Sequence, residues 1–186
     1  MNAKVNFQLP EQLARAYSTL DMLNAYTLAF NTTTQLKTLV DRINKEAIFL
    51  KEYSQERGIH PFVYFDFESL ISTFQYLADD RGDAFDVERE KYQDALNNSD
   101  TKFDAGDLYE VYALAHEVSS WLCTLLFQIK NELFEIKKNS PALCDAVFAS
   151  LERLICLTEY FADNHSNIFD VEAKKYEAEW EALKNE

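Results

Sequence analysis

The chain has 186 residues and a net charge of −14, with 32 Asp and Glu against 18 Lys and Arg. This excess of acid repels the phosphates of nucleic acids and anionic lipid surfaces, so we expect no direct nucleic-acid binding and no membrane binding. Hydrophobic residues make up 47% of the chain, enough for a folded core despite the charge. The sequence shows neither an apolar secretory segment at its start nor a long apolar span, so we expect a cytoplasmic protein.

Part of the sequence occurs twice. The segment Tyr76–Tyr92 recurs as Tyr160–Tyr176 at an offset of 84, with nine of 17 positions identical, and residues 26–46 match 112–132 at an offset of 86. The offset changes between about residues 47 and 67, where we place a connection between helices. Because repeats set the architecture, we predict two tandem helical repeats with an internal pseudo-twofold. They span residues 19–98 and 99–186, follow an N-terminal extension of residues 1–18, and form one compact domain.

The extension contains Pro10, which suits the first turn of a short helix. The first long helix is predicted over 19–56, because Ser18 and Asp21 have the spacing of a capping box. Its second half carries apolar residues every three or four positions, which indicates one buried stripe. Residues 31–34 are poor helix formers, so we expect the helix either to run through or to bend there.

The next two helices are predicted over 64–79 and 85–98, with a loop from Asp79 to Asp83 between them. The second repeat is predicted to do the same with helices over 105–138, 141–163 and 168–185, the first of them capped by Asp104 and Asp107. Arg57–Pro61 and Lys138–Pro141 are expected to break the chain between helices. Only three glycines and three prolines are present, which favours long helices. The prediction is an all-α bundle of six main helices in two three-helix repeats.

The repeated loop is acidic and is the first candidate binding site. Its carboxylates do not have the ligand spacing of an EF-hand calcium loop, so helix capping by residues such as Asp83, Asp86 and Asp170 is the preferred interpretation. Phe85 and Phe169 are expected to anchor the two loops to the core. The candidate acidic residues are Asp79, Asp83, Asp86, Glu88, Asp163, Asp170 and Glu172.

Metal and catalytic motifs are otherwise missing from the sequence. The three histidines and three cysteines lack zinc spacing, and no Glu-x-x-His pair, phosphate-binding glycine loop or nucleophile elbow occurs. We therefore expect no cofactor, and we expect Cys123, Cys144 and Cys156 to be buried reduced thiols. One alternative stays open, in which Glu46 and Glu132 meet between the repeats and bind a metal ion.

Aromatic residues exceed what the predicted stripes need, with 14 Phe, 10 Tyr and 2 Trp. Aromatic side chains between Phe62 and Phe67, and Trp180 among glutamates, could form an apolar patch ringed by acids. Such a patch suits a protein partner or a homodimer. The other explanation for the extra aromatic residues is a wide core between the two repeats, which would bury them. We therefore predict a non-enzymatic acidic protein of regulatory or adaptor type. The alternatives are a DNA mimic that inhibits a nucleic-acid-binding protein, and a metal-dependent enzyme with helix-borne carboxylates.

Overall fold

The computed structural model describes residues 16–96 and 101–184. They form four long helices: α1 (Thr19–Gln55), α2 (Phe65–Ala95), α3 (Ala105–Lys138) and α4 (Ala149–Lys184). Two short 3-10 helices, η1 (Pro61–Tyr64) and η2 (Asp145–Val147), precede α2 and α4. The described residues contain no strand, only an isolated bridge between Tyr17 and Phe103. The predicted all-α helical bundle is confirmed, and none of the described helices is long and apolar enough to cross a membrane.

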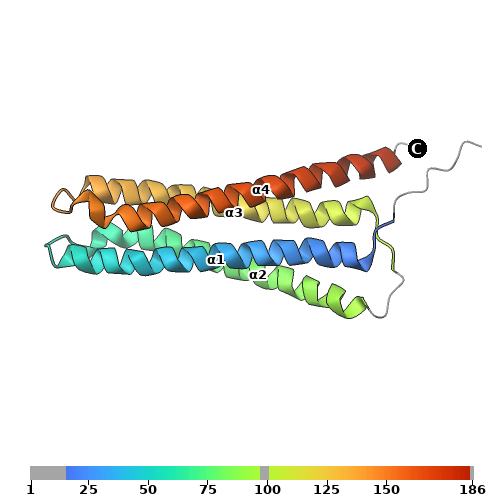
Figure 1. Cartoon of the computed structure of the whole chain (residues 1–186), viewed down its shortest axis with the longest axis horizontal. Coiled ribbons are helices and arrows are strands. Elements are labelled where there is room, and N and C mark those ends of the chain that lie inside the picture. The colour runs from blue at the N-terminus through green and yellow to red at the C-terminus, as the bar shows by residue number, and fades with distance from the viewer. Residues whose placement is uncertain (1–15, 97–100, 185–186) are drawn as a thin grey trace, which may run out of the picture.

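The four helices lie side by side and run alternately up and down (Figure 1). The closest neighbours are α1 with α2 and α3 with α4, which form two helical hairpins. The hairpins meet along two seams, α1 against α4 and α2 against α3. Both hairpin turns lie at one end of the bundle, whereas the connection from α2 to α3 lies at the other end (Figure 1).

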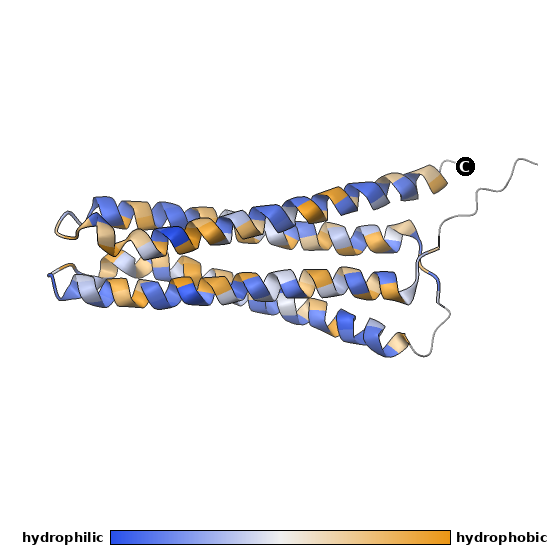
Figure 2. Cartoon of the chain, in the orientation of Figure 1, coloured by the Kyte–Doolittle hydropathy of each residue, from blue (hydrophilic) through white to orange (hydrophobic). Residues whose placement is uncertain are grey.

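One continuous hydrophobic core holds the hairpins together. Apolar residues recur every three or four positions on all four helices, and Figure 2 shows the resulting mixture of hydrophobic and hydrophilic residues along each of them. The predicted stripe of α1, from Leu36 to Leu50, is buried against its equivalent on α3, from Leu122 to Ile136, and against α2 and α4. Phe85 and Phe169 are 2% and 1% exposed, so both anchor to the core as expected.

The predicted starts of α1 and α3 are confirmed by their caps. The Ser18 side chain accepts a hydrogen bond from the Asp21 backbone N–H, and the Asp21 carboxylate accepts one from the Ser18 backbone N–H. Asp104 and Asp107 form the same reciprocal pair at the start of α3. Helix α1 runs through residues 31–34 without a break, and it ends before Gly58, whose φ of +80° suits a residue without a side chain.

The prediction of three helices in each repeat is wrong. Residues 64–79 and 85–98 were expected to be separate helices, yet residues from Phe65 to Ala95 form the single helix α2, and α4 likewise spans the second predicted loop. The buried stripe explains this continuity. It passes through Ala78, Gly82 and Phe85 at spacings of four and three without a change of phase, so a break would have rotated one half out of the core. Pro10 and the ends of the predicted helices at 97–98 and 185 lie outside the described residues.

The two hairpins repeat several specific contacts. Tyr26 stacks on Tyr92 with ring centroids 5.4 Å apart, and Tyr112 stacks on Tyr176 at 5.5 Å. Lys51 Nζ lies 2.7 Å from Glu68, and the equivalent Lys137 Nζ lies 2.9 Å from Glu152. Both pairs follow the sequence offsets of 86 on the first helix and 84 on the second.

At the end where α1 and α3 begin, α2 and α4 diverge from each other (Figure 1). A second apolar cluster fills the space there, with Met22, Leu108 and Tyr176 among its members. The Tyr17 hydroxyl donates a hydrogen bond to Glu179 on α4 at 2.7 Å. We call this the flared end.

Candidate functional site

The acidic residues predicted as a binding site lie inside helices. Those from the first repeat are on α2 and those from the second are on α4, and these two helices diverge at the flared end (Figure 1). The structure therefore does not bring the two sets together into one site. The predicted capping role of Asp83, Asp86 and Asp170 is wrong, because no helix begins at these residues.

Ion pairs along the same helix account for several of these carboxylates. Glu88 pairs with Lys91 at 2.8 Å, and Glu172 pairs with Lys175 at 2.6 Å. Three further predicted site residues are also paired, as Asp86 with Arg89, Asp170 with Lys174, and Asp79 with Lys37. The Lys174 ammonium lowers the pKa of Asp170 below its usual value through this hydrogen bond. These pairs are partly exposed, so each contributes little to stability.

Asp83 and Asp163, the remaining predicted acids, are exposed on α2 and α4. Trp180 lies half-buried, where its ring stacks on Tyr109 of α3 at 6.0 Å and the Lys184 ammonium lies 3.1 Å from the ring centroid. A side chain at Gly106 would come within 2.8 Å of the Trp180 ring nitrogen, so glycine allows this close approach. Trp180 therefore packs the C-terminal part of α4 against α3.

No metal or catalytic centre is found in the described part of the chain. It holds no group of three or more His, Cys, Asp and Glu residues that could bind a metal ion. The buried polar residues of this part are all Ser and Thr, so no described carboxylate points into the core from a buried position. Glu46 and Glu132, the pair considered for a metal, are half-buried and belong to no such group.

Polar side chains interrupt the core near the middle of the bundle. The Thr32 hydroxyl lies 3.2 Å from His165 Nδ1 across the α1/α4 seam, and His116 Nδ1 lies 3.1 Å from the Ser166 carbonyl oxygen. Burial lowers the pKa of His165 below its usual value. The Ser166 hydroxyl also lies 3.3 Å from His116 Nδ1, so two hydroxyls stand beside histidines in this part of the bundle. Thr32 and Ser166 are both buried, so these contacts are hydrogen bonds between helices and not a site open to a substrate.

The cysteine prediction is wrong for two of the three thiols. Cys144 and Cys156 are exposed, because they lie outside the buried stripe, while Cys123 is half-buried. Burial, together with a hydrogen bond to Asp163, raises the pKa of Cys123 to about 12, so its thiol stays protonated at neutral pH. All three are free thiols.

The surface shows a different candidate, an apolar groove where α1 meets α4. Two hollows of about 370 and 380 Å³ lie along this seam. We call them together the α1/α4 groove. Its lining residues are Gln35, Thr38, Leu39, Leu157 and Phe161 in the first hollow, and Glu46, Phe49, Tyr53, Ala146, Val147, Ser150 and Leu151 in the second.

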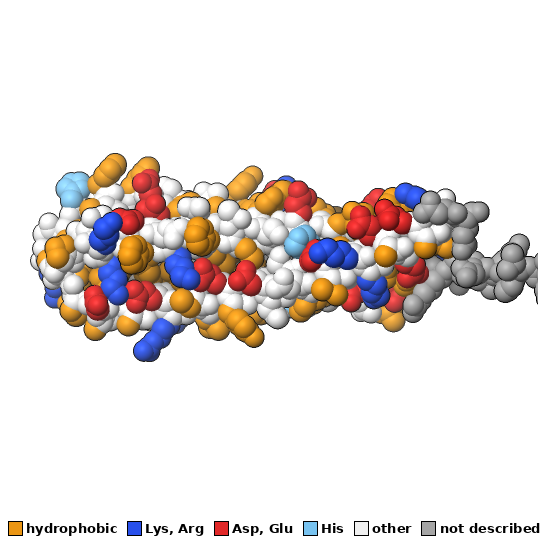
Figure 3. Space-filling model, turned by 90° about the horizontal axis from the view of Figure 1, so that it is seen from above, with side chains coloured by type: hydrophobic (Ala, Val, Ile, Leu, Met, Phe, Trp, Pro, Cys, Tyr) orange, Lys and Arg blue, Asp and Glu red, His pale blue; other side chains and the backbone are white. Residues whose placement is uncertain are grey.

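Large apolar side chains in the groove are left in contact with water. Phe49 is 59% exposed and Leu157 is 54% exposed, and they come from different helices. Exposed hydrophobic side chains also stand among charged ones over other parts of the surface, as Figure 3 shows for one face. A hollow of about 280 Å³ between α3 and α4 also has an exposed aromatic residue, Phe134, in its wall. The groove is more extensive, because two hollows with exposed apolar side chains follow one seam, and apolar side chains grouped in this way are typical of protein interfaces.

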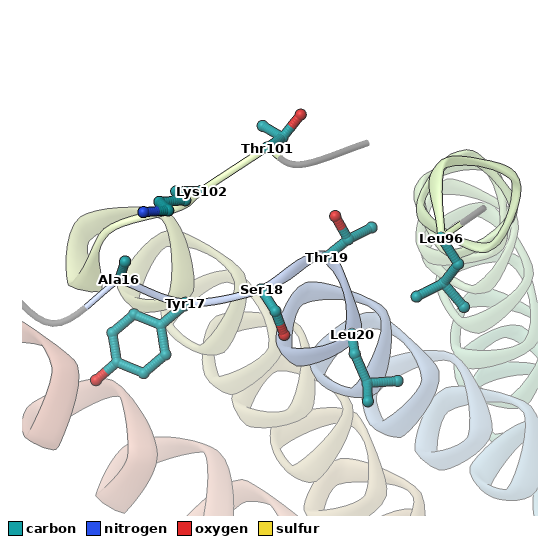
Figure 4. Close-up of a pocket in the computed structure, with 8 residues that line it drawn as sticks. All are labelled: Ala16, Tyr17, Ser18, Thr19, Leu20, Leu96, Thr101 and Lys102. Carbon is teal, nitrogen blue, oxygen red and sulfur yellow. The ribbon is translucent and has the colours of Figure 1, made fainter. Parts of the chain in front are cut away.

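Another hollow lies at the flared end, between the start of α1 and the end of α2 (Figure 4). Its walls are mixed in character, with Leu20 and Leu96 opposite the backbone around Thr101. Ser18 in its wall already serves the α1 cap, and the Tyr17 ring points toward α4. The hollow therefore presents few groups for a ligand.

The groove was not predicted from the sequence. Of the aromatic residues between Phe62 and Phe67, Phe62 and Phe65 are exposed, at 71% and 56%, whereas Tyr64 and Phe67 are buried. Phe62 and Phe65 stack on each other at the start of α2 and not in the groove. The signal that could have located the groove is the difference between the two repeats at outward-facing positions.

No family model, no curated protein and no solved structure matches this chain.

Proposed function

We propose that this protein is a non-enzymatic interaction protein of regulatory or adaptor type, which binds a protein partner through the α1/α4 groove. The observation that supports the proposal is the pair of hollows with Phe49 and Leu157 exposed between two helices. Complete burial of a fully exposed side chain of this kind contributes about 1.5–3 kcal/mol, and Phe49 and Leu157 have a little over half of their surface left to bury. The proposal includes a cytoplasmic location, for which the three free thiols are the support.

Capture of the partner tests this proposal. The full chain is immobilised and exposed to a lysate of its source cells, beside the double variant Phe49→Glu/Leu157→Thr. We expect a protein that is retained by the native chain and lost with the variant. A control variant, Thr73→Glu/Gln128→Glu, changes the other seam and should retain the same protein. A partner that binds all three chains equally would contradict the proposed site.

We also propose that the two hairpins are related by an approximate twofold. The shared tyrosine stacks and the shared Lys–Glu pairs support this relation. Under it, the α1/α4 groove has an equivalent position in the α2/α3 seam, so each residue of one seam can be compared with its counterpart in the other.

A DNA mimic is the second candidate, favoured by the distribution of charge. The described residues 19–34, 82–96, 102–120 and 163–184 surround the flared end and contain sixteen acidic against six basic residues. A nucleic-acid-binding protein that is captured by the chain and displaced by excess duplex DNA would support this candidate. Capture that is insensitive to DNA and lost with Phe49→Glu/Leu157→Thr would reject it in favour of the groove.

A further inference from the structure

Three basic side chains beside the α1/α4 groove lack an acidic partner. Arg42, Lys45 and Arg153 are exposed and take part in none of the ion pairs among the residues that the structure describes. Most of the basic residues that the structure describes do pair with a carboxylate. Glu46 is the one carboxylate among the described residues that line the two hollows. The groove is therefore a locally basic strip on an acidic protein.

Helix periodicity places two of these bases between the hollows. Arg42 lies three residues after Leu39 and four before Glu46, so it shares the α1 face that carries both hollows. Arg153 lies three residues after Ser150 and four before Leu157, on the side of the groove that α4 forms. A ligand that filled both hollows would pass between these two guanidinium groups.

The other seam lacks these features at the equivalent positions. By the sequence offsets, Arg42 and Lys45 correspond to Gln128 and Asn131, and Arg153 corresponds to Ser69. Exposed Phe49 and Leu157 correspond to Glu135 and Thr73. The exposed basic and apolar residues of the α1/α4 seam thus both differ from their counterparts in the α2/α3 seam. Buried counterparts such as Ile43 and Ile129 are apolar in both halves of the chain. Because the basic and the apolar differences lie on the same seam, one ligand that contacts both kinds of side chain would account for them.

We infer that the α1/α4 groove binds an amphipathic helix that carries acidic residues on both sides of its apolar face, a conclusion that rests on the proposed function. The spacing of the hollows suits a helix. Thr38 and Phe49 line different hollows from α1, and Phe161 and Ser150 do the same from α4. Each of these two pairs spans about three helical turns, which corresponds to about 16 Å along the helix axis. Apolar side chains at positions i and i+11 of the partner helix therefore lie on one face and enter the two hollows.

The net charge of −14 does not prevent this binding at physiological salt. The screening length is about 8 Å at 0.15 M, so the distant acids of the flared end contribute little at the groove. Beside the groove, the three free bases Arg42, Lys45 and Arg153 outnumber Glu46, the carboxylate that lines the second hollow, so the local charge favours carboxylates on the partner.

Two designed helical peptides, each about 18 residues long and therefore about five helical turns, test the inference with the full chain. Both carry Leu at positions i, i+4, i+7 and i+11, but one has Glu and the other Lys on the flanks of the apolar face. Binding is measured by fluorescence anisotropy at 0.15 M salt. We expect the Glu-flanked peptide to bind at least tenfold more tightly than the Lys-flanked peptide. Equal affinities, tighter binding of the Lys-flanked peptide, or no binding of either peptide would overturn the inference.

Substitutions by the counterpart residues separate the contributions of charge and of apolar surface. Arg42→Gln/Arg153→Ser should bring the two peptides to within about threefold of each other. Phe49→Glu/Leu157→Thr should weaken both by at least tenfold. Gln35→Trp introduces the Trp found at the equivalent position 121 and should block the first hollow. The control Thr73→Glu/Gln128→Glu should change neither affinity, and circular dichroism verifies that each variant is folded.

The outcomes distinguish this inference from the proposed function. Loss of the native partner with Phe49→Glu/Leu157→Thr, but no preference for the Glu-flanked peptide, would leave the interaction function standing and reject the acidic helix. Sedimentation of the protein alone tests a second copy as the occupant. A dimer that becomes monomeric in Phe49→Glu/Leu157→Thr would show that a second copy covers the groove, and would also overturn the acidic helix.

Discussion

Under the proposed twofold, the two seams between the hairpins are equivalent, yet they present different surfaces. Their buried residues agree, as Ile43 agrees with Ile129 and Ile155 with Ile71. Their outer residues differ, since the α1/α4 groove carries Phe49 and unpaired bases where the α2/α3 seam carries Glu135, Gln128 and Asn131. Few substitutions are tolerated in the core, because any change of volume there is costly. The surface is free to diverge, so differences between repeats locate function better than similarities do.

Gln35 and Trp121 show the contrast within a single pair of positions. Gln35 lines the first hollow of the groove, whereas Trp121 stands at the equivalent place in the α2/α3 seam with Arg81 5.8 Å from its ring centroid. A large aromatic ring occupies space that the smaller amide leaves open. Trp121, itself 39% exposed, therefore covers a place on its seam that stays open beside Gln35.

The largest expected effect concerns the buried core, where the two hairpins have the same residues at corresponding positions. Phe85→Ala and Phe169→Ala should each lower the free energy of unfolding by about 3–5 kcal/mol, because both rings are fully buried. Urea denaturation measures the two changes. If one of them costs less than about 1 kcal/mol, far below the usual cost of such a truncation, the two positions are not equivalent in the core.

A smaller effect tests the equivalence of the helix starts. Ser18→Ala and Asp104→Ala should each lower the free energy of unfolding by about 1 kcal/mol, because each removes the side-chain acceptor of a capping box. Ser18→Asp and Asp104→Ser, which exchange the two cap residues, are the controls and should be nearly neutral. A cost for Ala at only one site would mean that the caps do not contribute alike.

Lowering the pH tests a difference between the two seams, because His165 of the α1/α4 seam corresponds to Arg81 in the α2/α3 seam. Burial lowers the pKa of His165 below the value of 6.5 that it has when unfolded, so the unfolded chain binds the proton more readily. The stability that His165 provides is therefore present above about pH 6.5 and is lost as the pH falls through its folded-state pKa. Urea denaturation between pH 7.5 and 5 should show a smaller fall for His165→Gln than for the native chain. An unchanged fall would mean that protonation of His165 does not weaken the seam.

The smallest expected effect concerns the groove itself. Phe49→Glu and Leu157→Thr give the groove its counterpart residues and should each change the free energy of unfolding by at most about 0.5 kcal/mol, because both side chains are more than half exposed. Thermal unfolding measures this. A loss above about 2 kcal/mol for either variant, which is typical of core substitutions, would show that these residues serve folding instead of binding.

Much of the fold could be predicted from local patterns. The repeat predicted equivalent elements, and the capping boxes at Ser18 and Asp104 predicted the first residues of α1 and α3. The error at residues 79–86 arose because Asp, Gly and Asp resemble a loop with a cap when the apolar period is not followed through them. Gly82 is tolerated inside α2 because it is buried, with Thr33 of α1 as the nearest contact for a side chain at that position. Tertiary packing thus outweighed local propensity.

Local sequence patterns dictate that the chain is helical, where its long helices begin, and which faces are buried, because these properties depend on the order of nearby residues. The tertiary structure decided which helices are neighbours, and hence that α1 and α4 meet. Phe49 and Leu157 lie in opposite halves of the chain, and nothing in local periodicity brings them together. The groove exists because two hairpins pack against each other with unequal side chains on their two seams, and that inequality becomes visible only when the seams are assembled.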